Sequence, residues 1–204
     1  MLFSRLLANI DYMKKAEILL GLLVLISLIL NITLTLKSTA LTVLSLGILS
    51  SFYAYLSFAL FNEIELRKIF KKESYVKINT LRIIGAILTG LALSTTIVGL
   101  LFIVQSWPGS SVNLGLGLFG LSISLIISIL KYKKTKSSYY LNILKRIAIY
   151  GGLGLILFIL PEGSWLDFKY QNYPDYIEAI NRTKSDPNNQ ELWDKVDKER
   201  EKIK

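Results

Sequence analysis

LRIIGAILTGLALSTTIVGLLFIV (81–104), QSWPGSS (105–111) and VNLGLGLFGLSISLIISIL (112–130) follow one another in the middle of the chain. The first and third of these segments are apolar, and Arg82 is the only ionisable residue in either of them. With about 1.5 Å of rise per residue, about 20 helical residues cross the ~30 Å hydrocarbon core of a bilayer. The segments therefore predict two antiparallel membrane helices joined by a tight turn.

Three further apolar segments predict that the fold is all-α, a polytopic membrane protein with about five transmembrane helices. They occupy residues 18–36, 38–62 and 147–161 of a chain of 204 residues that is 52% hydrophobic and 19% charged. The last segment is short for a span, but Lys145 and Arg146 can extend their charges to one interface while Trp165 and Leu166 lie at the other. The predicted organisation is a surface segment (1–16), a transmembrane bundle (17–161) and a helical tail (162–204).

Basic residues alternate between the loops and predict the orientation of the bundle. Residues 1–161 hold 16 Lys and Arg against five acids, whereas residues 162–204 hold eight against ten. Apart from Lys37 and Arg82, the basic residues among the first 161 lie before the first span, between the second and third, and between the fourth and fifth. By the positive-inside rule these regions face the cytoplasm, and in a bacterium the tail lies in the periplasm. Since the basic residues flank spans and meet lipid, nucleic acid is not an expected partner.

The first 15 residues allow two interpretations. Leu2, Phe3, Leu6, Leu7, Ile10 and Met13 lie at helical spacing opposite polar residues, which is typical of an amphipathic helix on the membrane surface. The alternative is a hydrophobic extension of the first span. No cleavable signal peptide is predicted, because the first apolar run is too long for a signal sequence.

Small residues repeat at helical spacing on the third and fourth spans and predict close helix packing. On the third span they are Gly85, Thr89, Ala92, Thr96 and Gly99, and on the fourth they are Gly117, Gly120, Ser124 and Ser128. A polar conduit along the same residues is the alternative interpretation. Asn31 in the first span is expected to form a hydrogen bond across a helix interface, with a role as a substrate ligand as the alternative.

The composition excludes many kinds of chemistry. There is no Cys and no His, so the sequence contains no thiolate or imidazole for catalysis or for metal and haem ligation. No phosphate-binding loop, paired carboxylates or activated serine is found. We expect no catalytic residue, no cofactor and no metal site, and the protein is not expected to be an enzyme.

Trp107, Pro108 and Gly109 form the most distinctive motif, a tight reversal in which Gly109 suits a positive φ and Trp107 anchors the turn at an interface. Gly99-Leu-Leu-Phe102, the Trp-Pro-Gly turn and the glycines at 115 and 117 resemble the transmembrane hairpin of the GldL family. These are inner-membrane proteins of gliding motility and type IX secretion in Bacteroidota, and the resemblance covers residues 85–131. It implies a helical hairpin. The family has an intramembrane Glu in its second helix, whereas residues 112–130 contain no acid, so the motor function is not carried over.

The tail predicts two short amphipathic helices whose exposed aromatic residues, Tyr173, Tyr176 and Trp193, contact a partner. The whole pattern favours a non-catalytic structural or accessory subunit of a larger bacterial inner-membrane complex. Two alternatives are a motor-related component of type IX secretion or gliding and a small channel or carrier. The expected partners are the lipid bilayer and other membrane-protein subunits.

Overall fold

The computed structural model describes residues 12–34, 38–76 and 78–203, and the regular elements in these ranges are all helices. The predicted fold class is confirmed: five helices are long and apolar enough to cross a membrane. Four of them are α2 (Tyr12–Ile32), α3 (Ser38–Phe61), α4 (Thr80–Val104) and α5 (Ser110–Thr135). The fifth span runs from Ser138 to Ile159.

The fifth span begins earlier than the sequence analysis predicted. It joins α6 (Ser138–Arg146), a π-helical turn η3 (Ile147–Gly151) and α7 (Gly152–Ile159) into 22 residues, so that Lys145 and Arg146 lie inside the helix. The apolar run marks only the part of this helix that contains no charge.

The first span also begins earlier than predicted. Residues 12–16 belong to α2, so this part of the N-terminal segment continues the first span. The rest of the predicted surface helix, residues 1–11, lies outside the described residues. Because α2 starts at Tyr12, Glu17 is part of a membrane-spanning helix.

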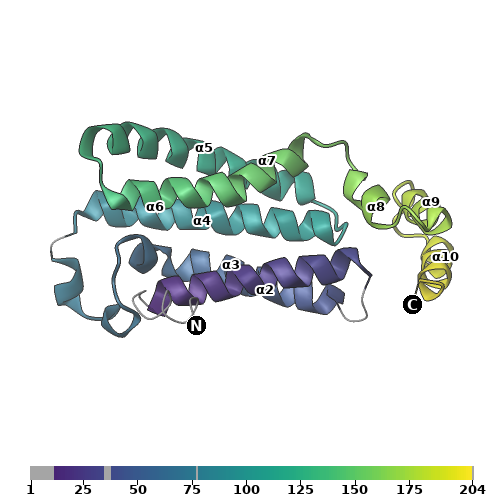
Figure 1. Ribbon diagram of the computed structural model, residues 1–204. Coiled ribbons are helices and arrows are strands. Elements are labelled where there is room, and N and C mark those ends of the chain that lie inside the picture. Colours follow the sequence, from purple (N-terminus) through teal and green to yellow (C-terminus); the bar gives the residue numbers. More distant parts are fainter. Residues whose placement is uncertain (1–11, 35–37, 77, 204) are drawn as a thin grey trace.

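The five spans form an antiparallel bundle (Figure 1). α4 packs against both α3 and α5, α2 packs against α3, and the fifth span lies across α4 and α5. We call the end of the bundle that contains the α4–α5 connection the turn end, and the opposite end the basic end. At the basic end, the connection from α3 to α4 contains the short 3-10 helices η1 (Leu66–Lys68) and η2 (Lys72–Tyr75).

Hydroxyl pairs join neighbouring spans along the bundle. Ser27 and Ser45 join α2 to α3 with 2.8 Å between their oxygens, and Ser50 and Ser94 join α3 to α4 at the same distance. The Thr89 hydroxyl donates to Ser124 across α4 and α5 at 3.0 Å. These pairs satisfy polar groups inside the bundle, where no water competes for them.

The tail lies beyond the turn end (Figure 1). It consists of α8 (Ser164–Lys169), α9 (Pro174–Thr183) and α10 (Gln190–Glu201), and α9 and α10 pack against each other. The Trp165 indole N–H donates to the Val104 carbonyl at 3.1 Å. This bond attaches the start of the tail to the last turn of α4.

Candidate functional site

A buried ion pair connects the first and fifth spans, and it is the main cluster of charged groups inside the described part of the bundle. Arg146 in α6 donates from Nε to Glu17 Oε1 at 2.6 Å and from Nη2 to Glu17 Oε2. The arginine and glutamate side chains are only 11% and 14% exposed. Two parallel N–H···O bonds between a guanidinium and a carboxylate form the strongest geometry available to such a pair.

The remaining polar groups of the pair also have partners. Tyr53 in α3 donates its hydroxyl to Glu17 Oε1 at 2.5 Å, and Arg146 Nη1 donates to the Asn142 carbonyl at 2.8 Å. The guanidinium carbon also lies 5.2 Å from the centre of the Phe61 ring. A buried pair with this many partners is much less costly than one without additional hydrogen bonds.

Aromatic rings enclose the pair on the side of the π-helical turn. The Tyr53 side chain is fully buried, and its ring meets the Tyr150 ring edge-on, with 5.4 Å between the centres. Tyr150 belongs to η3, the turn that directly follows Arg146. Three separate spans therefore contribute to one cluster: Glu17, Tyr53, Arg146 and Tyr150.

Sequence reasoning missed this cluster because it placed the start of the first span at Ile18, next to Glu17. It also placed Arg146 outside the fifth span. The signal that could have found it was the presence of one acid and one arginine next to two apolar runs, because opposite charges at matching depths can pair inside a membrane. Nothing in the spacing of the sequence indicates that residues so far apart are neighbours.

Most of the small residues predicted for the third and fourth spans lie at the contact between α4 and α5. A Cβ at Gly99 would lie 2.8 Å from the Leu114 backbone, and a Cβ at Gly117 would lie 2.4 Å from Thr96 Oγ1. Ala92 faces Gly120 in the same way, and Thr89 is bonded to Ser124. Ser128 is buried, whereas a Cβ at Gly85 would meet the Tyr139 hydroxyl of α6 at 3.8 Å.

Gly90 makes a close contact that the sequence analysis did not single out. A Cβ there would lie 1.9 Å from Ser57 Oγ and 2.6 Å from the Tyr53 carbonyl oxygen. α4 therefore uses small residues on two faces, toward α3 and toward α5. For Asn31, the structure differs from the expectation: the side chain is buried, and neither amide atom has a hydrogen-bond partner among the described residues.

The Trp-Pro-Gly motif follows a helix end of the Schellman type. The Trp107 N–H donates to the Phe102 carbonyl at 2.8 Å, the Ser106 N–H donates to the Ile103 carbonyl at 3.0 Å, and Ser106 has a φ of 56°. The Phe102 and Trp107 rings meet edge-on, which provides the apolar contact that accompanies this motif. Gly109 has a φ of 83° before α5 begins at Ser110, and Pro108 precedes it.

The three aromatic residues assigned to partner contact have different environments. Tyr176 is buried inside the tail, with its ring centre 4.6 Å from that of Tyr170, so it offers little surface to a partner. Tyr173 is half-buried at the start of α9. Trp193 is 40% exposed, and its indole N–H donates to the Pro187 carbonyl at 2.8 Å.

Fold and site together define a multi-pass helical membrane protein in which a buried ion pair connects the first and last spans. Comparison with known proteins finds no matching family model, no matching curated protein and no matching solved structure. The described residues include no cluster of three or more acidic side chains that could hold a metal ion.

Proposed function

We propose that this protein is a non-catalytic, structural or accessory subunit of a larger complex in a bacterial inner membrane. The observation that supports this proposal is the hydrogen bonding of Glu17, the only acid within the described membrane spans. Its two oxygens accept hydrogen bonds from Arg146 and Tyr53. Glu17 therefore connects three helices and is not a free charge in the bundle.

Ion-coupled transport needs a group that gains and loses charge as the protein changes state. Three hydrogen bonds hold the Glu17 carboxylate in place, two of them from the Arg146 guanidinium and one from the Tyr53 hydroxyl. The pair is electrically neutral as a unit, and separating it would leave two buried charges without partners. These properties suit a fixed connection between helices.

The orientation and the partner surface belong to the same proposal. By the positive-inside rule, the basic residues at one end of the bundle favour a cytoplasmic N-terminus and a periplasmic tail. The tail exposes Trp193 and Phe168, the latter at 54%, and large exposed aromatic residues are typical of contact surfaces. A second membrane-protein subunit is the partner that we expect there.

The test is purification of the full-length protein at native abundance in mild detergent, followed by identification of stoichiometric companions. We expect at least one membrane protein to remain bound. Trp193→Ala should weaken its recovery several-fold, whereas Tyr176→Phe, which changes a buried ring by one hydroxyl, should not. A protein that purifies alone under all mild conditions would contradict the proposal.

A carrier or channel remains the second candidate, because a buried carboxylate next to a π-helical turn is an arrangement found at functional sites. A flux measurement distinguishes the accessory subunit from the carrier or channel. Purified protein in liposomes should conduct neither protons nor small ions if the accessory role is correct. Proton flux that Glu17→Gln abolishes would favour the carrier.

A further inference from the structure

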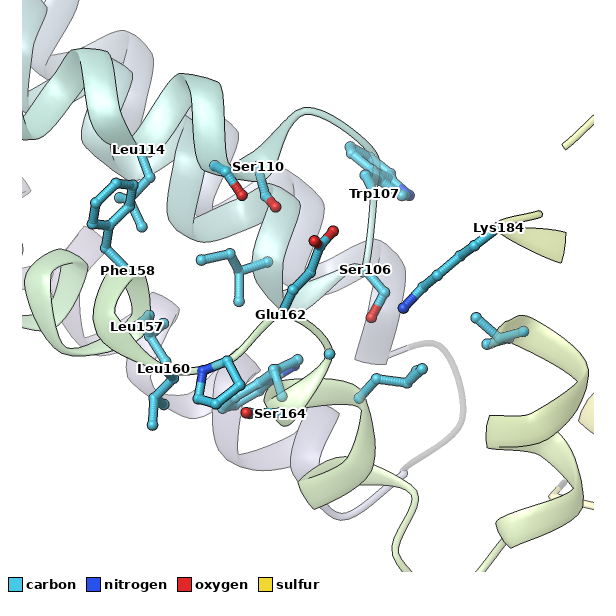
Figure 2. Close-up of a pocket in the computed structure, with 17 residues that line it drawn as sticks. Ser106, Trp107, Ser110, Leu114, Leu157, Phe158, Leu160, Glu162, Ser164 and Lys184 are labelled. Carbon is cyan, nitrogen blue, oxygen red and sulfur yellow. The ribbon is translucent and has the colours of Figure 1, made fainter. Parts of the chain in front are cut away.

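A cavity of about 340 Å³ lies at the turn end of the bundle (Figure 2). It is lined by the connection between α4 and α5, the end of α7, the segment from Pro161 to Leu166, and two residues of the tail, Ile180 and Lys184. Its volume is within the range of about 300–1,000 Å³ that is usual for small-molecule sites.

One wall of the cavity is polar and contains both signs of charge. Figure 2 shows Lys184 extending toward Ser106, and Glu162 pointing toward Ser110. Within the described part of the chain, neither charged group forms an ion pair. A Cβ at Gly163 would lie 3.7 Å from Lys184 Nζ, so the ammonium passes close to this backbone. Ser106, Ser110 and Ser164 also line the cavity.

The opposite wall is apolar, and part of it lies on the outer surface of the bundle. Leu114, Leu157, Phe158 and Leu160 form it (Figure 2). Phe158 and Leu160 are 48% and 47% exposed, so this wall continues onto the outside of the spans. Trp107 and Trp165 also line the cavity, and tryptophan is enriched at the level of lipid headgroups.

We propose that this cavity binds one zwitterionic phospholipid with a primary ammonium in its headgroup. Lys184 and the Ser106 hydroxyl donate to the phosphate, Glu162 accepts from the ammonium, and an acyl chain follows Leu157 and Phe158 into the bilayer. A purely anionic headgroup would leave Glu162 without a partner and close to a like charge. A soluble zwitterion would leave the apolar wall uncovered, which is why the ligand is assigned as a lipid.

The test uses the purified full-length chain in detergent, with defined lipids added in equal amounts and retained lipid counted by native mass spectrometry. We expect phosphatidylethanolamine to be retained at least tenfold better than phosphatidylglycerol. Phosphatidylcholine should also be retained poorly, because its quaternary ammonium cannot donate a hydrogen bond to Glu162. Free phosphoethanolamine at the same concentration should not displace the lipid; displacement would overturn the assignment of a lipid.

Substitutions at Glu162 and Lys184 test the contribution of each charge on its own. Glu162→Gln should remove the preference for phosphatidylethanolamine over phosphatidylglycerol, and Lys184→Gln should lower retention of all three lipids about tenfold. Ser110→Trp fills the cavity without a change in charge and should lower retention to the same extent. Glu191→Gln and Lys198→Gln change exposed charges on α10 away from the cavity and should retain lipid normally. Equal retention by cavity variants and controls would overturn the proposal.

Discussion

Glu17 and Arg146 are hydrogen-bonded although 129 positions separate them in the chain. Both side chains are nearly buried, so the protein tolerates each charge inside the bundle only because the other is present. Their local sequences do not show this dependence, since each residue alone is unfavourable at that depth. Losing one of the two charges should therefore destabilise the protein more than losing both.

We predict that Glu17→Gln destabilises the bundle by about 3–5 kcal/mol, because it leaves the Arg146 guanidinium buried without its counter-charge. The double variant Glu17→Leu/Arg146→Met should recover most of that loss, since two apolar side chains can fill the same space. Thermal unfolding in detergent measures both effects. The exposed pair Glu178 and Arg182 is the control, and its removal should cost less than about 1 kcal/mol. If Glu17→Gln unfolds like the unchanged protein, the ion pair does not support the bundle.

Lys169 at the end of α8 predicts a pH dependence of the tail. Burial lowers the pKa of its ammonium to about 8, from the usual 10.5. Between these two values the unfolded tail binds a proton that the folded tail has lost, so its stability should rise with pH from about 8 upward. Burial also raises the pKa of the neighbouring Tyr170 above its usual 10.0, so Tyr170 ionises first in the unfolded chain and opposes the rise at higher pH.

Tryptophan fluorescence during thermal unfolding at a series of pH values follows this effect. Lys169→Met should raise the midpoint at neutral pH and remove the rise between pH 8 and about 10. Lys195→Met, which changes an exposed lysine of α10, should leave the rise in place. An unchanged pH profile in Lys169→Met would assign the titration to another group.

The glycines of the membrane helices differ in how closely other atoms approach them, so substitutions to alanine at crowded and open positions can be compared. Gly99→Ala places a Cβ 2.8 Å from the Leu114 backbone, and Gly117→Ala places one 2.8 Å from Thr96 Cα. Backbone atoms cannot move aside as a side chain can, so each substitution should destabilise the protein by about 1–3 kcal/mol. Gly47→Ala and Gly21→Ala, which meet nothing within 4 Å, should be neutral or stabilising by less than about 1 kcal/mol. Thermal unfolding distinguishes the two groups, and equal behaviour would contradict the contact.

Regular patterns explain which elements could be predicted from the sequence. The spans α2 to α5 follow from long apolar runs, and the positions of the small residues follow from the helical period of three and four residues. The start of the fifth span does not, because hydropathy counts Lys145 and Arg146 as unfavourable without regard to Glu17. The spacing of small residues also predicts which face of a helix is closely packed, but not which helix packs against it. For this reason the contact of Gly90 with α3 was missed.

In the tail, too, the sequence predicted helices but not the contacts between them. The two amphipathic helices α9 and α10 could be predicted from the sequence, whereas the short helix α8 was not predicted. Tyr176 was assigned to a partner surface because its helix is amphipathic, yet it packs inside the tail against Tyr170. An apolar stripe indicates that a face is covered and does not indicate what covers it.

For the whole molecule, the orientation is the property that most needs measurement. We predict that the N-terminus is cytoplasmic and that the tail lies on the other side of the membrane. A reporter that is active only in the periplasm, fused after Lys204, should be active, and the same reporter inserted at Lys136 should be inactive. A stable but inactive C-terminal fusion would mean that the span from Ser138 to Ile159 does not cross.

The π-helical turn at Ile147–Gly151 gives the fifth span a phase shift along its length. One extra residue in a helical turn rotates everything on one side of it by about 100° relative to the other side. Arg146 before the turn faces Glu17, whereas a Cβ at Gly154 after the turn would lie 3.0 Å from Thr96 Cγ2 of α4. An unbroken α-helix with one residue fewer would keep either contact and rotate the other away. The added residue thus lets a single helix face two different neighbours, and its loss would break the contact of the fifth span either with the first span or with α4.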